Sequence, residues 1–213
     1  MTTAFSHVLA FAAAAAVLVA TPGLDTAVVL RQAAVGGPKS AVLAASGVVM
    51  GLLVWGLTAA AGLTAMLLAS HLAYTVLKWA GAAYLMVIGV RMLLDRDTHH
   101  SPTARDLSPM GGDGVASFRR GLLTNLLNPK IGLFYVTFLP QFIPSGTSVG
   151  AFALMLAGIH LLLTAAWFSA LVTLSVPARR LLTKPAFTRT LNRAAGCLFV
   201  GFGLKLAASH NPN

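Results

Sequence analysis

Long apolar runs recur along the whole chain, separated by short polar connections that carry most of the charge. A helix needs about 20 predominantly apolar residues to cross a bilayer. With 57% hydrophobic and only 9% charged residues, the chain is too apolar for an ordinary soluble domain. The runs predict an all-α, polytopic membrane protein with six transmembrane helices, at residues 4–32, 40–69, 72–94, 118–142, 149–176 and 194–208.

The basic residues gather in alternate connections. Twelve of the fifteen Lys and Arg residues follow the first, third and fifth predicted spans, and the connections after the second and fourth carry none. Short loops rich in Lys and Arg remain on the cytoplasmic side of a membrane, so both termini are expected outside. The net charge of +10 therefore indicates orientation in a lipid bilayer and no nucleic-acid partner.

One long polar stretch, DRDTHHSPTARDLSPMGGDG at residues 95–114, divides the chain. We expect a first three-helix repeat at residues 1–94, a cytoplasmic linker at 95–117 and a second three-helix repeat at 118–213. With three spans in each half, the second repeat must run inverted relative to the first. The adjacent histidines at 99–100 are interpreted as solvated loop, because metal sites need three or four converging ligands.

The first span of each half is interrupted at a similar depth. Thr21, Pro22 and Gly23 break the first span, and Pro129 breaks the fourth. Proline lacks an N–H and opens a helix, and non-helical backbone at membrane depth is tolerated only against protein or water. Paired interruptions in inverted halves are the strongest sequence indication of a transporter binding site near the midplane.

Charged and amide side chains stand beside both breaks. Asp25 is the only carboxylate outside the polar stretch, and Lys130 directly follows Pro129. Ionised groups at membrane depth usually face a cavity or each other, so we expect both in one cavity, where they form a pair or Asp25 carries a proton. Asn125 and Asn128 are expected to bind backbone or substrate, and the half-helices after the breaks to offer unpaired N–H groups.

The remaining polar residues are less specific. His160 lies four residues before Thr164 and is interpreted as a packed histidine, with a proton-relay role as the alternative. The single cysteine, Cys197, is expected to be a small buried hydrophobe. Gly47 and Gly51 form a GxxxG pattern that we assign to packing within the protomer, with a homo-oligomer as the open alternative.

The segments TPGLDTAVVLRQAAVGG, KWAGAAYLMVIGVRML and FRRGLLTNLLNPKIGLFYVTFLPQF give the chain a resemblance to the LysE/RhtB family of amino-acid exporters. The resemblance implies a bacterial inner-membrane transporter that moves amino acids or close analogues outward by proton antiport, with no cofactor. One departure is that Leu24 stands where the family usually has the second proline of Pro-Gly-Pro.

Other classes of function fit the sequence less well. A membrane-embedded enzyme or redox carrier would need a nucleophile, metal cluster or cysteine pair, and the chain has no HExxH, GxSxG or phosphate-binding loop. Export of a metal cation would call for several carboxylates or thiols at depth. Export of another small solute and a non-transport membrane protein are the remaining alternatives.

Overall fold

The computed structural model describes residues 2–69, 71–94, 114–174 and 185–208, and every regular element among them is helical. The expected all-α class is therefore confirmed for these residues. Most of the predicted linker, including the histidines at 99–100, lies outside them. The elements are α1 (Thr2–Ala20), α2 (Leu24–Ala69), α3 (His71–Leu94), α4 (Gly114–Leu126), α5 (Pro129–Leu133), the π-helix η1 (Phe134–Phe138), the 3-10 helix η2 (Leu139–Phe142), α6 (Val149–Thr173) and α8 (Pro185–Ala208).

Both predicted breaks are present. α1 ends at Ala20 and α2 begins only at Leu24, while α4 ends at Leu126 and α5 begins at Pro129. Each break is followed by a glycine with positive φ, Gly37 at 74° inside α2 and Gly146 at 77° before α6. A residue with a Cβ rarely adopts this conformation, so glycine allows the chain to reverse at these points.

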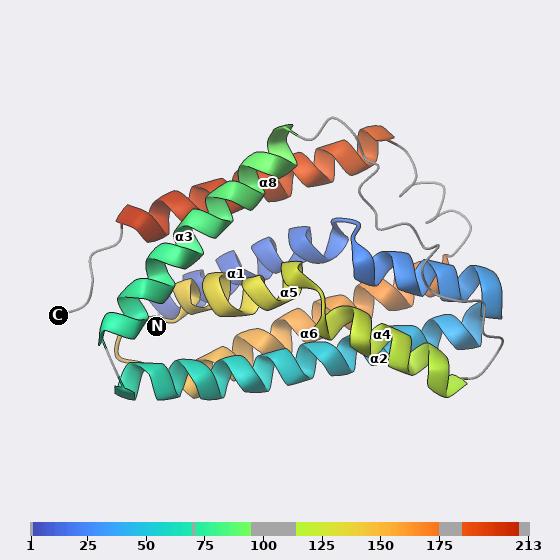
Figure 1. The fold of residues 1–213 in the computed structure, drawn as a ribbon, viewed down its shortest axis with the longest axis horizontal. Helices are drawn as coiled ribbons and strands as arrows, with labels where there is room; N and C mark the ends of the chain where they lie inside the picture. The colour runs from blue at the N-terminus through green and yellow to red at the C-terminus, as the bar shows by residue number, and fades with distance from the viewer. Residues whose placement is uncertain (1, 70, 95–113, 175–184, 209–213) are drawn as a thin grey trace.

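Helix ends gather at the two ends of the long axis (Figure 1). The start of α1, the end of α2, the start of α6 and the end of α8 lie at one end, on the left of the view. The turn within α2, the start of α4 and the end of α6 lie at the other. α2 packs extensively on α4 and α6, and α3 packs on α8. The two interrupted segments, α1 with α2 and α4 with α5, therefore meet near the middle.

Glycines bring α2 and α4 into close contact. A Cβ on Gly47 would overlap the backbone of Phe118, and a Cβ on Gly51 would lie 2.9 Å from the Cβ of Asn125. Small residues at such positions let two helix backbones approach each other. The GxxxG pattern therefore serves packing within the protomer, as predicted, and it sets the position of Asn125 along α2.

An aromatic cluster fills the core between α1 and η1–η2. The rings of Phe11, Phe134, Phe138 and Phe142 are buried, with neighbouring centroids 4.9–5.6 Å apart. Tilted and edge-on aromatic pairs at such distances stabilise a core beyond the area they bury. The expectation for Cys197 was wrong, because its side chain is exposed on α8.

By length and composition, two segments of the described chain are suited to crossing a membrane: residues 24–64 of α2, which include the turn at Gly37, and α6. The apolar parts of α1 and α3, at residues 4–20 and 81–94, are shorter. The helices occupy the six predicted segments, while the number of membrane crossings stays a prediction. The breaks explain in part why fewer segments than the six predicted are long enough to cross a membrane, because they divide long apolar runs into shorter helices.

Candidate functional site

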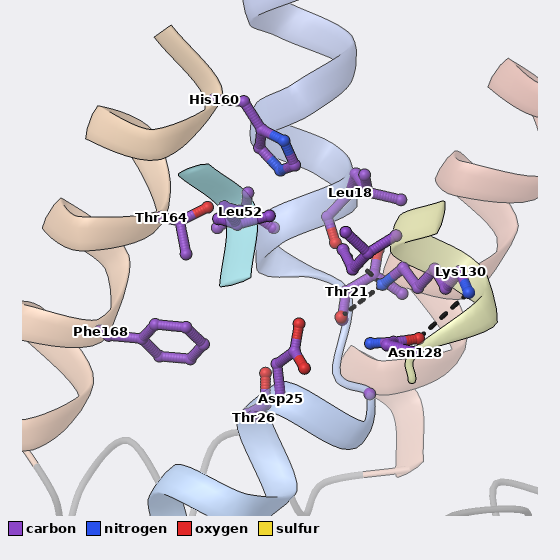
Figure 2. Close-up of a pocket in the computed structure, with 13 residues that line it drawn as sticks. Leu18, Thr21, Asp25, Thr26, Leu52, Asn128, Lys130, His160, Thr164 and Phe168 are labelled. Carbon is purple, nitrogen blue, oxygen red and sulfur yellow. Dashed lines mark hydrogen bonds between the residues drawn. The ribbon is translucent and has the colours of Figure 1, made fainter. Parts of the chain in front are cut away.

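The end of α1 is held by a lysine from the second half of the chain. Pro22 has no N–H, so the carbonyl of Leu18, four residues earlier, has no helical donor. The Nζ of Lys130 donates to this carbonyl and to that of Thr21, each at 3.0 Å. A cation at this position also suits the negative end of the helix dipole. The Lys130 ammonium therefore caps the first break, as Figure 2 shows.

The second break is satisfied in a related way. Pro129 leaves the carbonyl of Asn125 without its helical donor, and this oxygen accepts from the N–H of Asn128 at 3.1 Å and from the indole of Trp55 at 3.4 Å. A side chain from another helix therefore reaches the orphaned carbonyl at each proline. Trp55 could not be identified from the sequence, because it lies within an apolar segment of α2 that no polar residue or proline interrupts.

Asn128 caps the start of α5. Its Oδ1 accepts from the backbone N–H of Lys130 at 3.1 Å, and its carbonyl accepts from the N–H groups of Ile131 and Gly132, both at 3.1 Å. This arrangement is an N-cap followed by proline at the first helical position. The expectation that this half-helix offers unpaired N–H groups is therefore wrong, since Asn128 occupies all of them.

Asp25 lies in the first turn of α2 and is bound from the other break. Asn125 donates from Nδ2 to the Oδ2 of Asp25 at 2.9 Å, which joins residues 100 positions apart. The other carboxylate oxygen, Oδ1, is buried and has no hydrogen-bond partner in the described chain. Buried polar atoms are rarely left unpaired, so Oδ1 is suited to a proton, a water or a bound ligand.

Asp25 and Lys130 line one cavity, as predicted (Figure 2). They do not form an ion pair within the described residues, because the two carbonyls of the first break hold the Lys130 ammonium instead. Thr21, Gly23 and Asn128 also line this cavity. Asn125 and Pro129 do not line it: Asn125 contributes through its hydrogen bond to Asp25, and Pro129 by interrupting the helix.

The cavity has about 30 Å³ of free space and a polar wall on α6. His160 and Thr164 face it one turn apart, and both the Nδ1 of His160 and the Oγ1 of Thr164 are buried without a partner. The His160 ring packs 4.9 Å from Phe134, centroid to centroid. It is therefore a packed histidine that lines the cavity and has one buried nitrogen, Nδ1, without a hydrogen-bond partner in the described chain. A polar space of this size accommodates one or two waters.

Sequence reasoning missed the apolar walls of the cavity. Leu52 of α2 and Phe168 of α6 close it, and Thr26 adds a second buried hydroxyl beside Asp25. None of these residues departs from what an apolar helix ordinarily contains, so only the fold identifies them. The described residues hold no group of three or more His, Cys, Asp or Glu side chains close enough for a metal ion.

Helices interrupted at proline that meet at a buried polar cavity, in an apolar helical chain, are the arrangement of many membrane transporters. The chain belongs to the LysE type translocator family, whose sequence profile matches residues 16–210. The family is one of transporters, in agreement with the expectation from the sequence that this chain is not an enzyme.

Several curated proteins resemble the chain over most of its length. The uncharacterized membrane protein YrhP of Bacillus subtilis is 33% identical over 206 residues, covering 94% of this chain and 98% of that protein. The leucine efflux protein of Enterobacter sp. is 33% identical, covering 91% of each chain. The leucine efflux protein of Salmonella typhimurium is 31% identical, covering 89% of each. No solved structure matches the chain at a significant level.

Proposed function

We propose that the chain is a secondary exporter that moves amino acids outward across the bacterial inner membrane in exchange for protons. The observation that carries the proposal is the buried cavity at the two breaks, which is lined by Asp25, His160 and Thr164, each with a buried polar atom that has no hydrogen-bond partner in the described chain. Family membership and the leucine efflux relatives support the substrate class.

The site suits a zwitterion. The free Oδ1 of Asp25 suits the substrate ammonium, and the hydroxyl of Thr164 can accept a second hydrogen bond from it. Lys130 has three N–H donors and spends two of them on the first break, so one remains for the substrate carboxylate. In this proposal Lys130 links substrate binding to the conformation of the first break, because the same ammonium bonds the substrate carboxylate and the carbonyls of the break.

Proton coupling follows from the same carboxylate. If Oδ1 of Asp25 holds either a proton or the substrate ammonium, the two occupants exclude each other. If the transporter without substrate returns to its starting conformation only when Asp25 is protonated, transport exchanges substrate for protons. Asn125 stabilises either form, since its amide donates to Oδ2 and leaves Oδ1 available.

For the architecture, we propose six membrane spans in two inverted three-helix repeats, residues 1–94 and 118–213, joined by a cytoplasmic linker at 95–117. The order of break, glycine turn and long helix recurs in both halves, at Gly37 and at Gly146. The turn within α2, the start of α4 and the end of α6 share one end of the molecule (Figure 1). Lys39 beside the turn and Arg119 and Arg120 in α4 are basic residues near that end, which would therefore face the cytoplasm, with both termini outside.

The export profile of living cells tests the proposal. Wild type, Asp25→Asn and Lys39→Met are expressed at matched levels in a bacterial host fed mixed dipeptides, and extracellular amino acids are quantified by mass spectrometry. Lys39 is exposed beside the Gly37 turn and is the matched charge-removing control. We expect wild type and Lys39→Met to enrich one or a few amino acids in the medium at least tenfold over Asp25→Asn. Equal profiles for all three would refute the role of Asp25, and no enrichment by the wild type would refute amino-acid export.

A further inference from the structure

A second polar pair joins α2 to α4, in addition to Asp25 and Asn125. Ser117 of α4 donates from Oγ to the Oε1 of Gln32 in α2 at 3.0 Å, and both side chains are buried, at 2% and 6% exposure. Gln32 follows Asp25 by seven residues, and Ser117 precedes Asn125 by eight. In each helix this is two turns, so the two hydrogen bonds lie about 11 Å apart between antiparallel helices. The segment from Asp25 to Gln32 is therefore held against α4 at both of its ends.

The packing around this second pair is close and apolar. One turn away from it, a Cβ on Gly121 would overlap the carbonyl of Ala44, and Val28 and Val29 are buried in a cluster that α2 forms with α6. An amide and a hydroxyl buried there lose their hydration, and one hydrogen bond between them restores little net stability. Two apolar side chains of similar size would stabilise a permanently closed interface at least as well.

A polar pair has an advantage if the interface opens. In water the separated amide and hydroxyl bond to solvent, whereas separated apolar side chains would expose surface at a cost. The closed and open forms then lie close in free energy, as a protein that alternates between two conformations requires.

The opposite side of the cavity is closed differently. The aromatic cluster of α1 and η1–η2 begins there, where the ring of Phe134 lies 4.9 Å from that of His160. Opening on that side would expose several large rings, which costs more than exposing valine and alanine beside a polar pair. The side with Gln32 and Ser117 therefore opens more readily. It is the side of the turn within α2 and the start of α4 (Figure 1).

The cavity itself is closed to both sides. With about 30 Å³ of free space it has room for one or two waters and not for an amino acid. Substrate therefore reaches Asp25 only after the protein opens.

We propose that Gln32 and Ser117 form the cytoplasmic gate of the transporter, which their hydrogen bond holds closed in this structure. When residues 24–36 separate from α4, the gate opens and substrate enters the cavity from the cytoplasm. The proposal rests on the proposed function, including its assignment of the Gly37 end to the cytoplasm, and it adds the residues that control entry.

The test measures access to the cavity from each side of the membrane. Thr26, which is buried and lines the cavity, is replaced by cysteine in a full-length Cys197→Ser background, where it is the only thiol. A charged, membrane-impermeant thiosulfonate is added to inside-out or right-side-out vesicles, and labelling is followed by the mass of the protein. Ser117→Ala and the double variant Gln32→Leu with Ser117→Ala are made in this reporter. Ser46→Ala is the matched control, because the Ser46 hydroxyl is exposed and bonds a carbonyl of its own helix.

We expect Ser117→Ala to raise the rate of labelling from the cytoplasmic side at least fivefold. It removes the donor to the buried Oε1 of Gln32, which disfavours the closed form by about 5–150-fold. The double variant should label at the reporter's rate or more slowly, because both partners are then apolar and opening would expose the leucine. Ser46→Ala should match the reporter, and labelling from the outer side should not rise in any variant. Gln32→Asn shortens the acceptor and should give the same increase if Ser117→Ala does not accumulate.

Three results would overturn the gate. They are an unchanged cytoplasmic rate in Ser117→Ala, a rise from the outer side, and a double variant that labels faster than Ser117→Ala, since the substitutions would then only loosen the packing. A reporter that is labelled from neither side in any variant would mean that the cavity does not open. That result would refute the proposed function itself, which separates the two failures.

Discussion

Replacement of Lys130 by methionine removes the donor that satisfies the first break. The carbonyls of Leu18 and Thr21 then lose their 3.0 Å partners, and Pro22 cannot supply an N–H to the first of them. A buried carbonyl left unpaired costs about 1–3 kcal/mol, so the two together destabilise the fold by about 2–6 kcal/mol. For a chain of this size, 2 kcal/mol lowers the melting temperature by about 4–8 °C.

The assay is thermal unfolding of the detergent-solubilised protein, followed by tryptophan fluorescence. Lys39→Met is the control, because Lys39 is exposed and surface substitutions usually change stability by less than about 0.5 kcal/mol. Lys130→Met also has a stabilising effect, because methionine does not incur the desolvation cost of a buried ammonium. The single variant therefore measures a difference between two effects.

A double-mutant cycle removes that second term. Pro22→Ala restores an N–H at residue 22, which can bond the carbonyl of Leu18 as in an uninterrupted helix. The desolvation term is the same in both backgrounds and cancels in the cycle. We expect Lys130→Met to be less destabilising in the Pro22→Ala background by about 1–3 kcal/mol, the cost of leaving the Leu18 carbonyl unpaired. Strict additivity would refute the claim that Lys130 replaces the donor missing at Pro22.

Three further substitutions test the parts that surround the cavity. Gly51→Ala places a methyl 2.9 Å from the Cβ of Asn125 and should cost about 1–3 kcal/mol in thermal unfolding, whereas Gly62→Ala, which meets no atom within 4 Å, should not destabilise. Trp55→Phe removes the indole donor to the Asn125 carbonyl and should cost about 0.5–1.5 kcal/mol by the same assay. Asn125→Ala leaves Oδ2 of Asp25 unpaired, and export should fall at least tenfold at unchanged expression.

The breaks could be predicted from the sequence because their cause is local. Pro22 and Pro129 lack an N–H wherever they stand, and the glycines at 37 and 146 follow them at similar distances. The bounds of α3 and the start of α6 lie within one residue of the predicted ones, whereas α8 begins nine residues before the predicted start of the sixth span. The placement of Asp25 and Lys130 in one cavity needed one further assumption, that two ionisable groups in apolar helices avoid lipid.

The partners of those residues could not be predicted, because they depend on the packing of distant segments. Lys130 bonds the carbonyl of Leu18 across 112 positions, and Asn125 bonds Asp25 across 100. The sequence suggested a pair between Asp25 and Lys130 because opposite charges attract. Pro22 indicates in the sequence that a carbonyl loses its helical donor, but not that this carbonyl lies within reach of the Lys130 ammonium. Phe168 was equally hidden, since a phenylalanine in an apolar helix gives no sign that it lines a polar cavity.

The bonding of Lys130 constrains how such a transporter can move. Lys130 belongs to α5, and the carbonyls it holds end α1, so the two halves are joined at the site itself. If the halves rock relative to each other in transport, either α1 and α5 move together or Lys130 releases a carbonyl that has no other donor. A bound substrate carboxylate could draw the Lys130 ammonium away from that carbonyl, so this release would be possible only when substrate is bound. Substrate binding and the opening of the first break would then be coupled through one side chain.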